Sequence, residues 1–210
     1  MIDFWNSEKA VVIAELSCNH IQHFDIAVKT IEAMAESGVD VVKVQNDNAD
    51  GGITVDCDNK YFQVKGGTLW DGETLYSLYK KTDTPWDWLP KLQKLAHSFG
   101  MGFFSTPSDP SGVDFLEGLN VPVYKISSFE ITDIGLIEKV ARTGKPIIMS
   151  TGMSELHEVE QAIKVLKRAS ISPYKSSVTF PSIVSLIIYI VRVSLYTLST
   201  GSQSSSIPCL

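Results

Sequence analysis

Short apolar runs alternate with segments of helical period along residues 11–169 of this chain. The apolar runs at 11–15, 40–44, 101–104, 121–126 and 147–150 have the length of buried strands. The segments at 25–37, 86–99, 111–119, 134–142 and 155–168 place apolar residues three or four positions apart, as amphipathic helices do. Strands that alternate with helices pair in parallel through right-handed crossovers, so the pattern predicts an α/β fold.

Turn and cap residues mark the ends of the predicted helices. Gly38 and Gly100 follow the first two helical segments, where glycine commonly ends a helix. Thr84 and Pro85 predict an N-cap and a first-turn proline for the second helix. The later helices are predicted to begin at Asp109 or Ser111, at Thr132 or Asp133, and at Ser154.

Residues 51–83 interrupt the alternation between the second and third predicted strands. The segment is rich in Asp, Gly and aromatic residues. Long insertions that follow a strand of an α/β barrel often shape the mouth of the binding site. We therefore expect this insertion to lie at the ligand-binding end of the sheet.

Residues 170–210 break the pattern. Charged residues nearly vanish there, and an apolar run from Ile183 to Leu198 precedes a serine-rich end. Three interpretations are open: a membrane anchor, further βα units, or a segment foreign to the fold, such as a shifted reading frame. Arg192 interrupts a run that is already short for a membrane span, and polar faces of helical period are absent, so we favour the third. The predicted organisation is one α/β domain over 1–169 and an anomalous tail.

Charge and cysteine content narrow the function classes only slightly. A net charge of -6 gives no basic surface for nucleic acid or for an anionic membrane. The N-terminus lacks the basic and apolar regions of a signal peptide. Cys18, Cys57 and Cys209 show neither CxxC pairing nor metal-like spacing. We expect a cytoplasmic chain with no nucleic-acid or membrane partner.

Polar residues close every predicted strand. In chain order they are Glu15, then Lys43 and Gln45, then Ser105 and Thr106, then Lys125 and Ser128, then Ser150 and Thr151. Ligands of α/β barrels and doubly wound sheets bind at the carboxyl ends of the parallel strands. We therefore expect these side chains to share one rim.

Two lysines determine the charge of this rim. A lysine in an otherwise apolar strand is costly unless an anion meets it, and Lys43 and Lys125 both have such a position. Lysine binds phosphate as a point charge, while hydroxyls and backbone amides satisfy the other oxygens. The pattern favours a small ligand that carries phosphate and carboxylate. The alternative is that the lysines simply pair with Glu15 or Glu130.

Glu15 is the candidate acid/base residue, because a carboxylate beside an anionic ligand holds a proton more readily. Glu130 is a second carboxylate near the rim, suited to contact a hydroxyl-rich substrate or to position a water. His20 and His23 lie in the loop after the first strand. They have no third ligand at a metal-like spacing, so no metal site is predicted there.

Five strand-end motifs, in this order, resemble the sialic acid synthase family. They are Ile13-Ala-Glu-Leu-Ser-Cys-Asn-His20, Val41-Val-Lys-Val-Gln45, Phe104-Ser-Thr-Pro107, Tyr124-Lys-Ile-Ser-Ser-Phe-Glu130 and Ile148-Met-Ser-Thr-Gly-Met153. Within the insertion, segments 56–63, 65–72 and 84–88 look like the pseudaminic acid synthase branch. The resemblance covers about residues 8 to 168.

The resemblance implies a (β/α)8 TIM barrel, of which this chain has about five βα units. A small antifreeze-like domain follows the barrel in the family and is missing here. The resemblance implies catalytic roles for Glu15 and Glu130, phosphoenolpyruvate binding by Lys43, Thr106, Lys125, Ser128 and Ser150, and sugar-side positions for Asn19 and Gln45.

The implied activity is a transferase reaction. Phosphoenolpyruvate condenses with a 2,4-diacetamido-2,4,6-trideoxy hexose and phosphate is released. One alternative is N-acetylneuraminate synthase, which takes N-acetylmannosamine. Another is a non-catalytic fragment, because five strands of a closed barrel leave open edges that favour poor folding or aggregation.

The family also implies a divalent metal, Mn2+ or Mg2+, held by two histidines from later barrel strands. This chain has no histidine after His157, so those ligands are missing. The family is homodimeric, and the sequence leaves the oligomeric state of this chain open.

Overall fold

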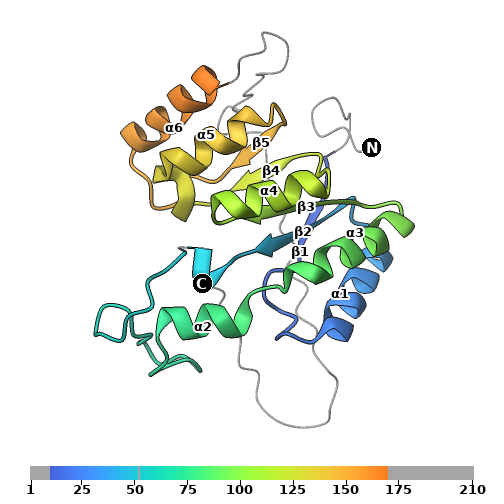
Figure 1. The fold of residues 1–210 in the computed structure, drawn as a ribbon. Coiled ribbons are helices and arrows are strands. Elements are labelled where there is room, and N and C mark those ends of the chain that lie inside the picture. The colour runs from blue at the N-terminus through green and yellow to red at the C-terminus, as the bar shows by residue number, and fades with distance from the viewer. Residues whose placement is uncertain (1–9, 52, 170–210) are drawn as a thin grey trace.

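The computed structural model describes residues 10–51 and 53–169. Strands and helices alternate through most of this range, as the hydrophobic pattern predicts (Figure 1). The elements are β1 (Ile13–Glu15), α1 (Phe24–Glu36), β2 (Val41–Asn46), the 3-10 turn η1 (Ala49–Gly51), α2 (Leu75–Thr82), η2 (Trp86–Trp88), α3 (Leu89–Ser98), β3 (Gly102–Pro107), α4 (Pro110–Gly118), β4 (Tyr124–Ile126), η3 (Phe129–Thr132), α5 (Ile134–Arg142), β5 (Ile147–Met149) and α6 (Leu156–Ala169).

The five strands form one sheet in the order β1-β2-β3-β4-β5, and every neighbouring pair is parallel. Strands that follow one another in the chain are therefore neighbours in the sheet, with helices in the crossovers. A (β/α) barrel builds its wall in this way. The α/β class expected from the sequence is confirmed, and the described residues form part of such a wall.

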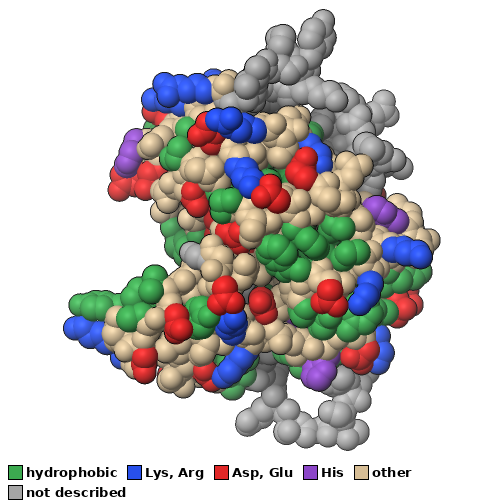
Figure 2. All heavy atoms as spheres, viewed as in Figure 1, with side chains coloured by type: hydrophobic (Ala, Val, Ile, Leu, Met, Phe, Trp, Pro, Cys, Tyr) green, Lys and Arg blue, Asp and Glu red, His purple; other side chains and the backbone are tan. Residues whose placement is uncertain are grey.

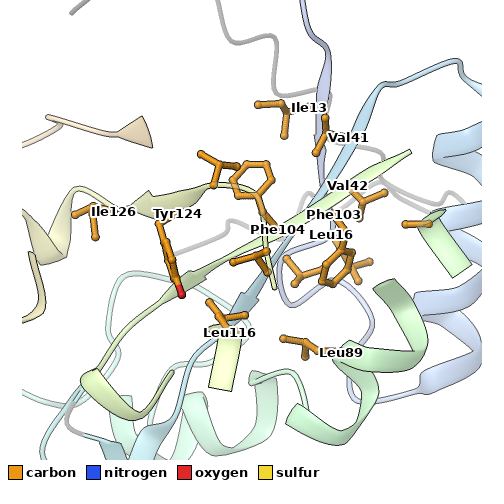
Figure 3. Packing of buried hydrophobic residues seen from close by; sticks show 14 of the residues in the cluster. Ile13, Leu16, Val41, Val42, Leu89, Phe103, Phe104, Leu116, Tyr124 and Ile126 are labelled. Carbon is orange, nitrogen blue, oxygen red and sulfur yellow. The ribbon is translucent and has the colours of Figure 1, made fainter. Parts of the chain in front are cut away.

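The register sorts the strand residues onto two faces. Val42 and Phe103 are register partners and point toward the helices, as does Tyr124, whose hydroxyl donates to the Val113 carbonyl oxygen of α4 at 3.3 Å. These side chains are fully buried and form the core with residues such as Leu116 (Figure 3). Because side chains alternate along a strand, the residues between them face the opposite side. We call that side the inner face.

Asp109 and Asp133 cap their helices as expected. Asp109 accepts hydrogen bonds from the backbone of Ser111 at 2.6 Å and of Gly112 at 3.2 Å, and Asp133 accepts from Leu136 N at 2.9 Å. Each acidic side chain thus satisfies amide groups that the first helical turn leaves without a partner.

Two other cap predictions are wrong. The Thr84 hydroxyl lies 2.9 Å from His20 Nε2, and the segment after it begins as η2 with no side-chain cap. The Ser154 hydroxyl donates to the Gly152 carbonyl oxygen at 3.3 Å, and α6 begins only at Leu156. At this second site Glu158 accepts from the amide of Glu155 at 2.8 Å, which is half of a capping box. The Thr84 hydroxyl thus serves a distant residue, and the Ser154 hydroxyl serves its own preceding turn.

The insertion between β2 and β3 forms a lobe that projects from the sheet (Figure 2). It contains η1, an antiparallel bridge between Gln63 and Thr74, and α2. The Gln22 amide joins it to the loop after β1, donating to the Lys80 carbonyl oxygen at 3.0 Å and to Asp83 Oδ1 at 2.7 Å. The arrowheads of β2, β4 and β5 point to the side where the space-filling view is indented beside this lobe (Figures 1 and 2).

The predictions for residues 170–210 lie outside the described residues. Within 10–51 and 53–169, no helix is both long and apolar enough to cross a membrane.

Candidate active site

Residues from all five strands or their ends line the inner face near the carboxyl edge of the sheet. Glu15 is the register partner of Lys43, and Gln45 is the register partner of Thr106. Lys125 pairs in register with Ile148, so Ser150, two residues on, continues the same face. The sheet therefore brings most of the expected strand-end residues to one rim. The expectation is wrong for Ser105, which is the register partner of Tyr124 and lies on the helix-covered face, where its hydroxyl donates to Asn46 Oδ1 at 2.7 Å.

Glu15 and Lys43 form an ion pair across β1 and β2. The side chain of Lys43 is 11% exposed and that of Glu15 is 13% exposed. Glu15 Oε1 also accepts from Ser17 N at 3.1 Å, which fixes the carboxylate. The sequence offered two interpretations of Lys43: binding of an anionic ligand, or pairing with a glutamate. Without a ligand, Lys43 pairs with Glu15.

Lys125 is buried but has a different set of partners. Its Nζ atom donates to Ser150 Oγ at 2.5 Å and to the Ile126 carbonyl oxygen at 2.8 Å. Among the described residues it forms no ion pair with a carboxylate. Burial, followed by the positive charge of Lys43, lowers the pKa of Lys125 to about 8, although the charges of Glu15 and Glu130 oppose this shift. The direct hydrogen-bond partners of this ammonium group that the structure describes are therefore neutral.

Two further hydroxyls lie at this rim. The Thr106 side chain is 2% exposed, and its Oγ1 atom has no hydrogen-bond partner among the described residues. Ser128 Oγ accepts from Gly152 N at 3.1 Å, and a Cβ atom on Gly152 would lie 3.0 Å from that oxygen. Because residue 152 is glycine, the loop after β5 can approach the loop after β4 closely. A buried hydroxyl without a partner is costly, which makes Thr106 available to a ligand.

Glu130 lies in η3, directly after β4. Its Oε2 atom is buried and has no hydrogen-bond partner in the described part of the chain. Burial raises the pKa of Glu130, while Lys125 and Lys43 oppose that shift. Glu130 is therefore close enough to both lysines to share their electrostatic environment.

The two candidate sugar-side residues occupy different settings. Asn19 Nδ2 donates to the Leu16 carbonyl oxygen at 2.9 Å, so its amide stabilises the loop after β1. Gln45 is half-buried on the inner face, beside Thr106 on the next strand. Gln45 lies on the lysine-bearing face, whereas the Asn19 amide group is directed to its own loop.

The structure adds Asp47 and Tyr79 to this group, and the sequence analysis missed both. Asp47 is 6% exposed, and burial, followed by the charge of Glu130, raises its pKa to about 7. Tyr79 on α2 is half-buried, and its pKa is raised by burial and then by Asp47 and Glu130. Alternation from Lys43 through Gln45 reaches Asp47, so the signal for this residue was present. No local signal places Tyr79, because its position depends on the fold of the insertion.

The described residues contain no group of three or more His, Cys, Asp or Glu side chains that could hold a metal ion. His20 is fully buried, and desolvation lowers its pKa to about 4. Its Nδ1 atom accepts from Gln22 N at 3.0 Å, so Nε2 carries the proton and donates to Thr84. This histidine is a structural link between the first loop and the end of the insertion.

A parallel sheet in chain order, with polar side chains at its carboxyl end, defines the class of (β/α) barrel proteins, and the chain belongs to one family of this class. It is a member of the NeuB family, whose sequence profile matches residues 30–183. The match reaches past residue 170, where the sequence analysis placed no resemblance.

Pseudaminic acid synthases are among the relatives of this chain. The pseudaminic acid synthase of Helicobacter pylori is 40% identical over 185 residues, covering 84% of this chain and 54% of that protein. The pseudaminic acid synthase of Campylobacter jejuni is 34% identical over 183 residues, covering 86% and 53%. This chain spans about half the length of these relatives.

A solved structure confirms the fold. The N-acetylneuraminic acid synthetase of Leptospira borgpetersenii superposes with a TM-score of 0.62 at 25% identity, covering 76% of this chain and 50% of that one. The resemblance to the sialic acid synthase family, and to its pseudaminic acid branch, is thereby confirmed.

Proposed function

We propose that this chain supplies the phosphoenolpyruvate-binding half of a pseudaminic acid synthase. The observation that carries the proposal is the pair of buried lysines, Lys43 and Lys125, on one face of the sheet. They come from strands separated only by β3, and each lies close enough to Glu130 to affect its pKa. A small ligand with two anionic groups matches two ammonium groups in this arrangement.

The hydroxyls complete the match. Thr106 Oγ1 is buried with no partner in the described chain, and Ser150 Oγ already meets Lys125 Nζ. An enol phosphate with a neighbouring carboxylate offers several oxygen acceptors that such hydroxyls can satisfy. Ser128 and the amide of Gly152 lie at the same end of the sheet and extend the set of donors.

The named relatives and the insertion support the sugar class. Both pseudaminic acid synthases align with more than four-fifths of this chain. Their product class calls for an acceptor with two acetamido groups and a deoxygenated terminal carbon. The lobe between β2 and β3 stands beside the indentation at the strand ends, where it can contact such a sugar (Figure 2).

The proposed reaction conserves atoms and protons as follows. The C3 carbon of phosphoenolpyruvate attacks the aldehyde carbon of the open-chain sugar, and the aldehyde oxygen takes up a proton. Water adds to the cation at C2 and loses a proton. The tetrahedral intermediate then breaks its C2–O bond to phosphate, the C2 hydroxyl proton passes to the departing phosphate, and C2 becomes the ketone of the keto acid. Lys43 and Lys125 hold the anionic groups, and Glu15 or Glu130 transfers a proton.

The described residues do not fit the divalent metal that the family resemblance implies. The described residues offer no group of His, Cys, Asp or Glu side chains to bind it. The steps assigned to this chain are therefore binding, orientation and proton transfer.

Calorimetric titration of the 210-residue protein with phosphoenolpyruvate tests the binding proposal. We expect one saturable site, and Lys43→Met should weaken it by at least about 30-fold, because losing one buried charge partner costs about 2 kcal/mol or more. Lys91→Met is the matched control, because Lys91 is 61% exposed in a surface ion pair. Equal affinity of the Lys43→Met and unchanged proteins would contradict the assignment.

The sugar is tested separately. Phosphate release is measured with phosphoenolpyruvate and either the 2,4-diacetamido-2,4,6-trideoxy hexose or N-acetylmannosamine. Faster release with the first sugar supports the pseudaminic acid assignment, and faster release with the second replaces it with the N-acetylneuraminate alternative.

A further inference from the structure

Asp47 is a buried carboxyl group at the rim that has no role in the account above. It follows β2 directly, and alternation from Lys43 and Gln45 puts it on the inner face. The indole of Trp86 holds its backbone, with Nε1 donating to the Asp47 carbonyl oxygen at 3.3 Å. With only 6% of its surface exposed, Asp47 has little water available to stabilise a negative charge.

The groups around Asp47 come from several elements at this end of the sheet. The charged and titratable members are Glu15 on β1, Lys43 on β2, Glu130 on η3, Asp83 after α2, and Tyr79 on α2, with Cys18 beside Tyr79. All three nearby carboxylates, Glu130, Glu15 and Asp83, favour the protonated form of Asp47. The positive charge of Lys43 favours the charged form. Burial and its neighbours raise the pKa of Asp47 to about 7.

With the proposed function as the basis, we propose that binding of a phosphate-bearing anion at Lys43 and Lys125 drives protonation of Asp47. The protonated carboxyl group then donates a hydrogen bond to the acceptor sugar. The anion engages the positive charge of Lys43, which is the neighbour that stabilises the Asp47 carboxylate. The anion also brings further negative charge to a rim that already holds Glu15 and Glu130. Both effects increase the affinity of Asp47 for a proton.

The insertion contributes to the surroundings of this carboxyl group. Tyr79 on α2 shares the electrostatic environment of Asp47 and Glu130, so α2 lies close to the cluster. A neutral carboxyl group can donate to an oxygen of the sugar, whereas a carboxylate can only accept. The first substrate thus prepares the site for the second.

Calorimetry with phosphoenolpyruvate alone tests this coupling. Titrations at pH 7 in two buffers of different ionisation enthalpy give the number of protons taken up per ligand. A group with a pKa near the working pH is half protonated, so Asp47 should contribute up to about half a proton. That contribution should disappear in Asp47→Asn, which keeps the shape of the side chain. It should persist in Asp87→Asn, because Asp87 is 71% exposed.

The outcomes separate the two proposals. If phosphoenolpyruvate does not bind to the unchanged protein, the proposed function fails. If it binds and Asp47→Asn takes up as many protons as the unchanged protein, only the role of Asp47 fails. A carbon-13 NMR titration of the Asp47 carboxyl group in the unchanged protein provides a second test. A pKa near 7 that rises when phosphoenolpyruvate is added supports the coupling, and a pKa near 4, or one that does not move, overturns it.

Discussion

Glu15 and Lys43 are register partners on neighbouring strands, and their side chains form an ion pair that is largely shielded from water. Lys125, two strands away from Lys43, is equally buried but meets only a hydroxyl and a carbonyl oxygen among the described residues. An incoming anion therefore meets a different situation at each lysine. It competes with Glu15 for Lys43, and it supplies the first negative partner for Lys125.

Glu15→Gln should have opposite effects on stability and on ligand binding. Loss of the carboxylate leaves Lys43 buried without its partner, so unfolding should become easier by about 1–3 kcal/mol. Phosphoenolpyruvate should bind a few-fold to about tenfold more tightly, because a competing negative charge is gone. Denaturant unfolding and calorimetry measure the two effects. Glu138→Gln is the control, because its ion pair with Arg142 is exposed. Weaker binding by Glu15→Gln would mean that Glu15 contacts the ligand directly.

Lys125→Met should abolish measurable binding of phosphoenolpyruvate. The methionine side chain keeps most of the apolar stem but removes the only ammonium group at β4. Calorimetric titration measures the affinity, with Lys164→Met on α6 as the control, since Lys164 is exposed. The assignment of Lys125 fails if its substitution leaves the affinity unchanged.

The buried His20 should make stability depend on pH. Its pKa is about 4 in the folded chain, against 6.5 for an ordinary histidine, so between these values the unfolded state binds more protons. The stabilisation is complete above pH 6.5 and is lost as the pH falls toward 4, by about 3 kcal/mol in total.

His20→Gln tests this pH dependence. Unfolding free energies measured at pH 7 and pH 4.5 should differ less in this variant than in the unchanged protein. His97→Gln should behave like the unchanged protein, because His97 is exposed on α3. The same pH dependence in the His20→Gln and unchanged proteins would show that His20 titrates normally.

Asp133→Ala should destabilise the chain by about 1 kcal/mol, because α5 loses its N-cap. Asp133 Oδ1 accepts from Leu136 N at 2.9 Å, and the helix packs its buried face against the core. Asp133→Asn keeps a capping oxygen and should retain most of the stability. Thermal unfolding compares the three proteins. Similar losses in both variants would point to the charge of Asp133 and not to its hydrogen bond.

The inner face of the sheet could be predicted because it follows from local rules. Parallel strands in chain order place their carboxyl ends together, and alternation places Glu15, Lys43 and Thr106 on the same side. The same alternation reaches Asp47, but the predicted strand ended at residue 44 and β2 runs to Asn46. Because the predicted strand ended too early, the alternation that would have placed Asp47 on the inner face was not applied to it.

The remaining differences come from contacts between distant segments. Thr84 has the sequence context of an N-cap, yet its hydroxyl serves His20, 64 positions earlier in the chain. Tyr79 reaches the rim because the insertion is held by the Gln63–Thr74 bridge and by Gln22. Predictions that use only residues close in sequence cannot identify contacts between such distant segments.

A structure of the chain with phosphoenolpyruvate bound tests the central claim most directly. The account predicts that the phosphate and carboxylate oxygens lie within about 3 Å of Lys43 Nζ and Lys125 Nζ. It also predicts that Thr106 Oγ1 gains a hydrogen bond from or to the ligand. Phosphoenolpyruvate bound away from both lysines would contradict the account.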